Sequence, residues 1–535
     1  MLLIEAFTEL LRVLDKRMLP DIAGQKLHRK VAISLFQACY RTVLSQQHDG
    51  SWNGMPEQTC YAILSLAQAS ELCFVQDMRS QLQFAIEHGI QFLKSRGFRS
   101  TDRSWTSKTA YRVSFVAEAY ELAALKVGEL QWPSGTVGCA LDSSLGPAKL
   151  GGFAQLIRKT PLFSGLPEWQ VRASLLESSF FVPLLRADRL KVYARDDMPV
   201  AEDRYLDLIP FTWVGCNNRN SSFVSTSLLY EMMLLSLFGY QTDEFFESVA
   251  APAFPETAGL HTLIDTIIDN IGKNADHVHH VSGSKSTHSN GSNTSSPGTP
   301  EVSGPLTSFV AHVLNHESVL AASAWDRENL HRELQAFLHA HATQAEDNAR
   351  FASQSFESKD VFTSTTRSFF QWVRTTGADH VACAYSFAFA CCLMSSSLSL
   401  GKEVFPTVSQ KYLSAAAVRH LTTTCRMYND FGSVARDTEE RNVNSVHFPE
   451  FAQCATALNG PLAGKRGTLV QLAEYEHACL AQTLKLLEHE MLQTQNGLEG
   501  HRVGGMKMRI VQFYCDVTTF YNQLYVLKDL SSSMK

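Results

Sequence analysis

The segment "CRMYNDFGSVARDTEERN", Cys425 to Asn442, places three oxygen-bearing side chains four residues apart. These side chains are Asn429, Ser433 and Asp437. On an α-helix a step of four residues turns the chain by about 400°, so the three side chains line one face. Oxygen ligands of this kind suit a hard cation such as Mg²⁺. A solvated, salt-bridged surface helix would show a similar charge pattern, so the segment alone leaves both interpretations open.

A second acidic cluster, the pentapeptide "DEFFE", follows an apolar segment far upstream. Asp243 and Glu247 in this cluster are spaced at i and i+4 and share one face of a helix. Many surface helices contain such a pair, so the pattern alone is a weak signal. Two details strengthen it. The acidic pair stands at the end of an apolar helix, and Phe245 and Phe246 are unsuited to a solvated face.

The chain between the two clusters is long enough for several helices that bring them face to face across a bundle. Two facing sets of oxygen ligands predict a shared Mg²⁺–diphosphate site, because the ions offset charge that neither protein nor substrate could bury alone. Arg426 and Arg436 lie within the segment from Cys425 to Asn442. We expect them to donate charge-assisted hydrogen bonds to the phosphate oxygens.

Helical periodicity dominates the chain that must position these residues. Segments such as "KVAISLFQACYRTVL" and "LAEYEHACLAQTLKLLEHEML" place apolar residues at i, i+3, i+4 and i+7, and no convincing run alternates with period two. We therefore expect an all-α fold. A polar segment near residues 185 to 200 predicts a boundary between domains 1–185 and 186–535. The Ser/Gly-rich segment within 273–304 predicts a disordered surface loop.

Composition narrows the class of protein further. The 535 residues carry a net charge of −6, which gives no electrostatic reason to expect nucleic acid as a partner. The longest apolar run, "VACAYSFAFACCLM", is too short to span a bilayer. The early Glu5, Glu9 and Asp15 argue against a signal or transit peptide. The twelve cysteines are then expected to be reduced, buried thiols of a cytoplasmic protein.

The two motifs, D-E-x-x-E and N-D-x-x-S-x-x-x-D, resemble the paired metal-binding motifs of class I terpene synthases. The resemblance implies a cluster of three Mg²⁺ ions, and it assigns no catalytic residue beyond the ligands of the metal and the diphosphate. The implied metal ligands are Asp243, Glu247, Asn429, Ser433 and Asp437, and the implied diphosphate ligands are Arg426 and Arg436. Asp437 stands where the family more often has Glu, which keeps the carboxylate but shortens the side chain by one methylene.

Longer segments narrow the resemblance to fungal bifunctional diterpene synthases of the copalyl diphosphate synthase/ent-kaurene synthase type. "YLDLIPFTWVGCNNRN" and "NDFGSVARDTEERNVNSVHFPEF" look like their C-terminal half, and the "DGSW" hairpin looks like their β domain. The resemblance implies a class I helical bundle, the α domain, preceded by an incomplete α/α-barrel that lacks the D-x-D-D motif. It also implies that a small prenyl diphosphate, ent-copalyl diphosphate, is ionised and cyclised to a kaurene-type tetracyclic diterpene.

The cation formed in such a reaction needs a dry, apolar cavity that is rich in π-electrons. Seven aromatic side chains are candidates for its wall, namely Trp213, Phe369, Phe370, Trp372, Tyr385, Phe387 and Phe389. Aromatic residues at helical spacing are more often plain core than pocket lining. The small-residue run from Ala382 to Cys392 is a candidate floor, where a helix could break and aim carbonyl dipoles at the cation.

Two rival interpretations stay open at this point. A protein prenyltransferase-like α/α-barrel would need a zinc site of Asp, Cys and His ligands, and the sequence shows no matching constellation. An inactive remnant or truncated fragment of a bifunctional cyclase would keep the same helices without turnover. The sequence leaves the oligomeric state open.

Overall fold

The computed structural model describes residues 2–16, 18, 24–96, 114–129, 135–139, 141, 146–194, 205–206, 208–278, 299–354, 360–454, 461–493 and 497–527. Within this part the elements are helical, and strand-type pairing is limited to one isolated bridge between Leu72 and Val137. The all-α fold expected from the helical periodicity is confirmed. No single described helix is long and apolar enough to cross a membrane, although the bent pair Phe369–His380 and Cys383–Leu398 meets that test when its two parts are taken together.

The chain divides into two compact units, each described here by itself. The first comprises Met1–Lys159 and Phe163–Arg186, and the second comprises Thr160–Leu162 and Ala187–Lys535. The identity of these units as a partial barrel domain and a catalytic domain stays a prediction. Of the loop predicted at 273–304, residues 279–298 lie outside the described part, whereas 273–278 end helix α11 and 299–304 begin helix α12.

The first unit contains the predicted "DGSW" turn between two of its helices. Its elements are α1 (Leu2–Asp15), α2 (Gly24–Leu44), α3 (Pro56–Ala69), η2 (Cys73–Met78), α4 (Arg79–Arg96), α5 (Ser114–Val127), α6 (Pro147–Ile157) and most of α7 (Glu168–Asp188). Trp52 is buried beside the turn, and its Nε1 donates a 2.7 Å hydrogen bond to the carbonyl oxygen of Thr42 at the end of α2. Its backbone N–H donates to Oγ1 of Thr59 in α3. The turn therefore clamps α2 to α3.

One pair of cysteines departs from the expectation that all thiols are reduced. Cys73 and Cys139 form a disulfide in the first unit. Backbone hydrogen bonds between two distant segments explain the pairing. The N–H of Cys73 donates to the carbonyl oxygen of Val137 at 2.8 Å, and the N–H of Val137 donates to the carbonyl oxygen of Glu71 at 3.0 Å. These bonds bring the two segments side by side. The other ten cysteines are free.

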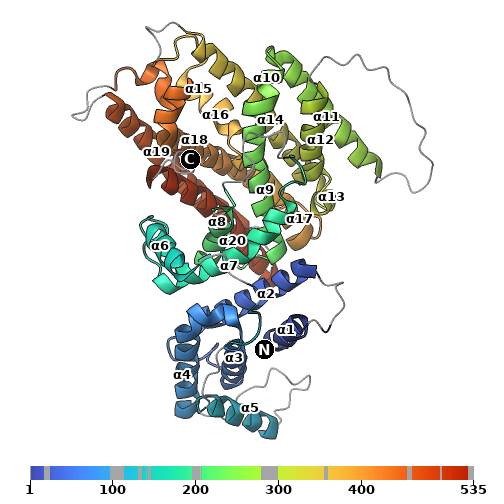
Figure 1. Ribbon diagram of the computed structural model, residues 1–535, viewed down its shortest axis with the longest axis vertical. Coiled ribbons are helices and arrows are strands. Elements are labelled where there is room, and N and C mark those ends of the chain that lie inside the picture. The colour runs from blue at the N-terminus through green and yellow to red at the C-terminus, as the bar shows by residue number, and fades with distance from the viewer. Residues whose placement is uncertain are drawn as a thin grey trace. The chain divides into compact units, whose positions relative to one another are not determined.

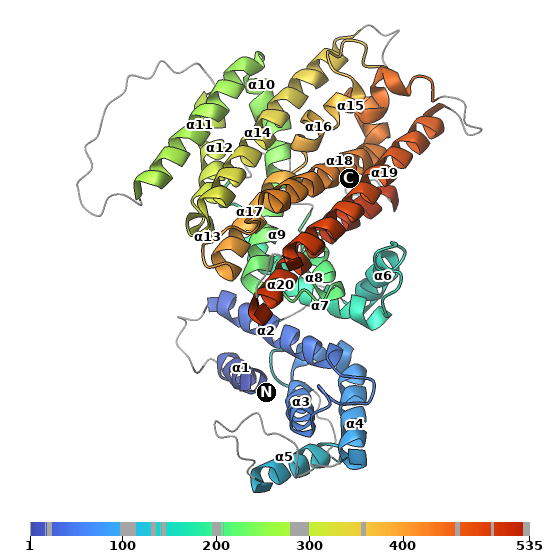
Figure 2. The same ribbon diagram turned by 180° about the vertical axis from the view of Figure 1, so that it is seen from behind.

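The second unit is a bundle of longer helices. Its elements are α8 (Ile209–Arg219), α9 (Thr226–Phe245), the π-turn η4 (Phe246–Ala250), α10 (Ala251–Ala253), α11 (Thr257–Val278), α12 (Thr299–Leu314), α13 (Glu317–Leu320), α14 (Ala324–Ala352), α15 (Phe369–Trp372), α16 (Thr376–His380), α17 (Cys383–Leu398), α18 (Val408–Glu440), η6 (Ser445–His447), η7 (Pro449–Phe451), α19 (Pro461–Gln493) and α20 (Gly497–Leu527). Helix α18 lies beside α19 and α20 (Figures 1 and 2), and α14 packs against α16 and α17.

The two helices that carry the sequence motifs have well-defined ends. At the start of α9, Oγ of Ser225 accepts a hydrogen bond from the backbone N–H of Leu228, and the helix runs through a mostly buried apolar stretch. At the start of α18, Oγ1 of Thr407 accepts from the N–H of Gln410. Helix α18 ends at Glu440. The next residue, Arg441, has a φ of 62°, the left-handed conformation that commonly follows the end of a helix.

The chain breaks between α16 and α17. Val381 is extended, with φ −78° and ψ 136°, and the axes before and after the break differ by 51°. Gly377 in α16 packs against Trp372 and Arg426, where a Cβ would come within 3.2 Å of each side chain. The break therefore sits beside the second motif on α18.

We expect Gly50→Ala to destabilise the protein more than Gly54→Ala. Both glycines have positive φ, 87° and 66°, so each alanine carries a conformational cost of about 1–2 kcal/mol. A Cβ on Gly50 would also lie 2.4 Å from the carbonyl oxygen of His88, whereas one on Gly54 meets no atom within 4 Å. The expected loss of unfolding free energy is about 3 kcal/mol or more for Gly50→Ala, measured by denaturant unfolding of the full chain. Equal losses in the two variants would contradict the assigned clash.

Candidate active site

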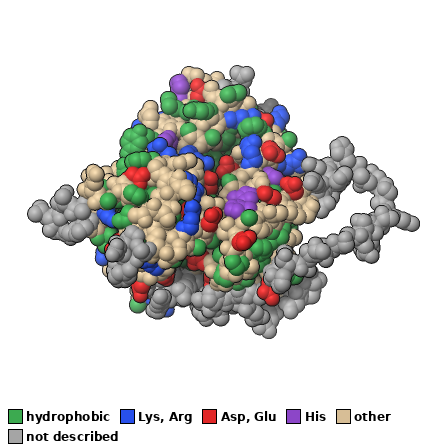
Figure 3. Space-filling view, turned by 90° about the horizontal axis from the view of Figure 1, so that it is seen from above, with side chains coloured by type: hydrophobic (Ala, Val, Ile, Leu, Met, Phe, Trp, Pro, Cys, Tyr) green, Lys and Arg blue, Asp and Glu red, His purple; other side chains and the backbone are tan. Residues whose placement is uncertain are grey.

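A cavity of about 710 Å³ opens within the second unit. Side chains from α8, α9, α14, α16, α17, α18 and α20 line it. All seven polar residues predicted from the two motifs are among them, namely Asp243, Glu247, Asn429, Ser433, Asp437, Arg426 and Arg436. Seen from above, acidic and basic side chains meet near the centre of this face of the molecule (Figure 3). Segments far apart in the sequence thus supply one polar site.

The first motif lies where α9 passes into the π-turn η4. Asp243 is partly exposed and Glu247 is exposed, both toward the cavity, yet protein surrounds them on most sides. This desolvation raises the pKa of Asp243 to about 6, although Arg426 and Arg436 act in the opposite direction. Desolvation and the neighbouring Asp243 raise the pKa of Glu247 to about 8. Both carboxyl groups therefore lie in a site that disfavours their negative charge when no cation is bound.

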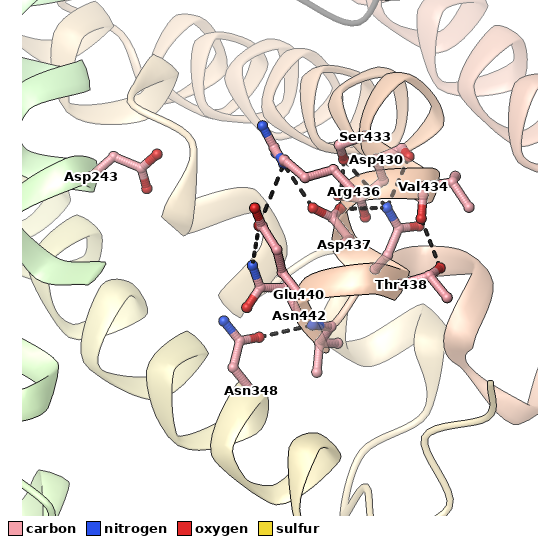
Figure 4. A network of polar contacts seen from close by, with 12 residues as sticks. Asp243, Asn348, Asp430, Ser433, Val434, Arg436, Asp437, Thr438, Glu440 and Asn442 are labelled. Atoms are coloured by element: carbon pink, nitrogen blue, oxygen red, sulfur yellow. Dashed lines mark hydrogen bonds and ion pairs between the residues drawn. The ribbon is translucent and has the colours of Figure 1, made fainter. Parts of the chain in front are cut away.

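The second motif lies along α18 and is held by side-chain hydrogen bonds. Oγ of Ser433 donates to Oδ2 of Asp437 at 2.6 Å, and Nδ2 of Asn444 donates to the same oxygen at 2.8 Å. Nη2 of Arg436 lies 3.4 Å from Oδ1 of Asp437. Figure 4 shows this network on α18, with the carboxylate of Asp243 directed toward it from α9. The two sets of predicted ligands thus face each other.

Arg426 is fixed by a buried partner that sequence reasoning missed. Its Nε forms a 2.9 Å ion pair with Asp430, which is fully buried and also accepts hydrogen bonds from the N–H and hydroxyl of Ser445. Its Nη2 donates to the carbonyl oxygen of Val443, and its guanidinium lies 4.8 Å from the ring centroid of Trp372. The available signal was the i, i+4 spacing of Arg426 and Asp430, because residues four apart on a helix lie on the same face.

The predicted aromatic wall is only partly present. Trp213 and Tyr385 line the cavity, whereas the remaining five candidates, Phe369, Phe370, Trp372, Phe387 and Phe389, do not. Phe369 and Trp372 are buried in a separate hydrophobic cluster with Phe448 and Phe451. Phe370 is 58% exposed at the surface. The ring of Phe387 packs on Tyr514 and that of Phe389 on His316, so both belong to the core behind the wall. For these five residues the expectation is corrected.

Tyrosines that the sequence analysis did not select supply much of the wall instead. They are Tyr205, Tyr240, Tyr514, Tyr521 and Tyr525. Tyr514, Tyr521 and Tyr525 are spaced at i, i+7 and i+11 on α20, a spacing that marks one helical face and was available as a signal. A helix break was expected within residues 382–392. The break lies at the start of this range, where Val381, Ala382 and Cys383 line the cavity.

Two histidines beside Asp243 complete the polar end. His341 from α14 and His380 from α16 line the cavity. One potential ligand atom from each histidine and one from Asp243 all lie within 4.8 Å of one another. Both stand outside the two motifs and far from each other in sequence, so no local pattern points to them.

Comparisons with known proteins give matches that cover nearly all of this chain. No protein-family model matches the chain. An ent-kaur-16-ene synthase of Fusarium fujikuroi is 50% identical over 540 residues, covering 100% of this chain and 55% of that protein. An ent-kaur-16-ene synthase of Phaeosphaeria sp. is 45% identical, covering 100% and 56%. A pimaradiene synthase of Emericella nidulans is 37% identical, covering 99% and 54%. The chain thus spans about half the length of the curated relatives it matches.

We expect Mg²⁺ to bind more tightly as the pH rises from 6 to 8. Below this window Asp243 and Glu247 hold protons that a metal ion must displace, and above it both carboxylates are free to bind, so the apparent affinity should rise at least about tenfold. The increase in unfolding temperature caused by Mg²⁺ at each pH measures this. A doubly neutral variant, Asp243→Asn with Glu247→Gln, should lose the pH dependence. An equal Mg²⁺ effect at pH 6 and pH 8 in the unmodified protein would contradict the arrangement.

We expect Asp430→Asn to destabilise the second unit. The change keeps the shape of the side chain but leaves the buried guanidinium of Arg426 without its charge partner, which costs about 3 kcal/mol. Asn429→Ala is the matched control, since Asn429 faces the cavity and should change the unfolding free energy by less than about 1 kcal/mol. Chemical denaturation of both variants makes the comparison. A stable Asp430→Asn variant would show that the ion pair does not anchor Arg426.

Proposed function

The chain is a homologue of fungal diterpene synthases, the ent-kaur-16-ene synthases among them, over about half of their length, and from this premise we propose that it is a class I diterpene cyclase. It ionises a prenyl diphosphate at the polar end of the cavity and cyclises the resulting cation within it. One observation carries the proposal. The oxygen ligands of two distant motifs, with Arg426 and Arg436, line a single cavity whose wall also includes Trp213 and several tyrosines.

The residues of the polar end fit a hard divalent cation. The donors at this end are carboxylate, amide and hydroxyl oxygens, and the raised pKa values of Asp243 and Glu247 mark carboxylates short of positive charge. We assign the Mg²⁺ ligands to Asp243, Glu247, Asn429, Ser433 and Asp437, with three ions by resemblance. Bound Mg²⁺ supplies Lewis-acid stabilisation of the charge that develops on the leaving diphosphate.

The protein's own groups bind and orient the substrate. Arg426 is preorganised by Asp430 and the carbonyl oxygen of Val443, so its guanidinium can donate to diphosphate oxygens with little ordering cost. Arg436 adds a second guanidinium on the same helix. The hydrocarbon then lies against Trp213, Tyr385 and the other tyrosines, whose π-faces stabilise a cation in the absence of water.

We further propose that the substrate is ent-copalyl diphosphate and the product a kaurene-type tetracyclic hydrocarbon. The names of the two relatives that are 50% and 45% identical support this choice. A zinc-dependent prenyltransferase-like activity has less support. Among the described residues, the group of His, Cys, Asp and Glu side chains whose ligand atoms lie within 4.8 Å of one another is Asp243, His341 and His380, and it contains no cysteine.

Replacing Asp243 or Asn429 with Ala should lower kcat/KM at least about a hundredfold, because each change removes a ligand that acts on the leaving group. Purified full chain is incubated with Mg²⁺ and either ent-copalyl or geranylgeranyl diphosphate, and products are identified by gas chromatography–mass spectrometry. Asp265→Asn is the control, since this exposed carboxylate on α11 pairs with His339 outside the cavity. Near-normal rates in the two alanine variants would contradict the assignment of the site. A wild-type chain without product from either substrate would favour an inactive remnant.

A further inference from the structure

His341 and His380 approach the same oxygen of the first motif. Nδ1 of His341 lies 3.6 Å from Oδ1 of Asp243, and Nε2 of His380 lies 3.7 Å from that oxygen. The two imidazole rings lie together, with centroids 4.1 Å apart. His341 projects from the middle of α14, and His380 is the last residue of α16, directly before the helix break. Two separate elements therefore bring imidazoles to one carboxylate.

Arg426 determines which nitrogen of His380 carries the proton. Nη1 of Arg426 lies 3.4 Å from Nδ1 of His380. A guanidinium has donors and no acceptor, so Nδ1 of His380 must accept in this contact. The proton of the neutral ring is then on Nε2, which is the nitrogen that faces Asp243. His380 thus connects an arginine of the second motif to the first carboxylate of the first motif.

His341 has no other use for its polar atoms. The side chain is 2% exposed, and its Nε2 is buried without a hydrogen-bond partner in the described structure. Each imidazole carries at least one N–H in either protonation state. Nδ1 of His341 faces Oδ1 of Asp243, which can accept that hydrogen.

We propose that His341 and His380 are positioning residues that hold Oδ1 of Asp243 between two N–H groups and turn the other carboxylate oxygen toward the cations and the diphosphate. This inference rests on the proposed function. The contacts of 3.6 and 3.7 Å are longer than formed hydrogen bonds. Contacts in catalytic sites are often long before ligands bind and shorten in the complex. The direction of Asp243 in Figure 4, toward the network on α18, agrees with this role.

The same three side chains have the composition of a transition-metal site, two imidazoles and one carboxylate. Arg426 argues against that use. A histidine bound to a metal normally donates its second N–H to a carboxylate, a carbonyl oxygen or water. The second nitrogen of His380 faces a guanidinium, which cannot accept it. We therefore assign the histidines to the carboxylate, and direct metal binding becomes an alternative that the experiment separates.

The test compares variants that keep or remove the relevant N–H. His380→Gln and His341→Asn retain an N–H close to the position of Nε2 and Nδ1, whereas His380→Leu and His341→Leu remove it. His339→Asn is the control, because His339 lies on the same helix and pairs with Asp265 at 2.7 Å outside the cavity. The measurements are Mg²⁺-dependent binding of inorganic diphosphate by calorimetry, the Mg²⁺ dependence of turnover and the unfolding temperature of the full chain.

We expect each leucine variant to require about tenfold more Mg²⁺ for half-saturation in binding and turnover, with kcat at saturating Mg²⁺ within about threefold of the wild type. The amide variants and the control should stay within about threefold throughout. Leucine variants with unchanged Mg²⁺ dependence, or with only a lower unfolding temperature, would overturn the proposal. Selective loss of Mn²⁺ or Co²⁺ binding in all four variants would show that the histidines are metal ligands. A wild-type chain that binds no magnesium diphosphate would overturn the proposed function and this inference with it.

Discussion

The desolvation of carboxylates that face one cavity is the constraint on which the interior of the second unit depends. Asp243 enters the cavity from α9, Glu247 from η4 and Asp437 from α18. Desolvation is the largest cause that raises the pKa values of Asp243 and Glu247, and repulsion from neighbouring carboxylates adds to it. Arg426 and Arg436 lower this cost without removing it. Binding of a cation, as proposed, would relieve this cost at a place where hydrophobic packing alone would have excluded charge.

The fold meets this constraint by making the supports of the site rigid. Asp430 and Asn444 hold the helix and the chain that follows it together, because Ser445 donates to Asp430 and Asn444 donates both to Asp437 and to the carbonyl oxygen of Asp430. This return of the chain is possible because α18 stops at Arg441 in a left-handed conformation. Arg426 and Asp437 are thus oriented by buried neighbours rather than by solvent, which reduces the reorganisation required on binding.

The sequence allowed the helical fold and the ligands within each motif to be predicted, because both follow from spacing along one helix. Asn429, Ser433 and Asp437 needed only the period of α18. Side chains assembled from distant segments were not accessible in this way. His341 and His380 meet Asp243 only through tertiary packing, and the disulfide of Cys73 and Cys139 depends on a contact between distant segments. Aromatic residues show the same limit, since Trp372 and Tyr385 were both predicted to line the cavity but one supports Arg426 and only the other faces the cavity.

The uneven polarity of the cavity has a consequence for any cation formed inside it. In the proposed reaction, a diphosphate bound at the α9–α18 end would remain in place while positive charge moves through a hydrocarbon that lies among the tyrosines of α20. Opposite unit charges about 4 Å apart attract by about 4 kcal/mol at an effective dielectric constant of 20, and the attraction weakens with distance. Each rearrangement that carries charge away from the anchored anion is therefore uphill electrostatically, and each that returns it is downhill. The protein would steer the order of ring closures through this slope as well as through the shape of its walls.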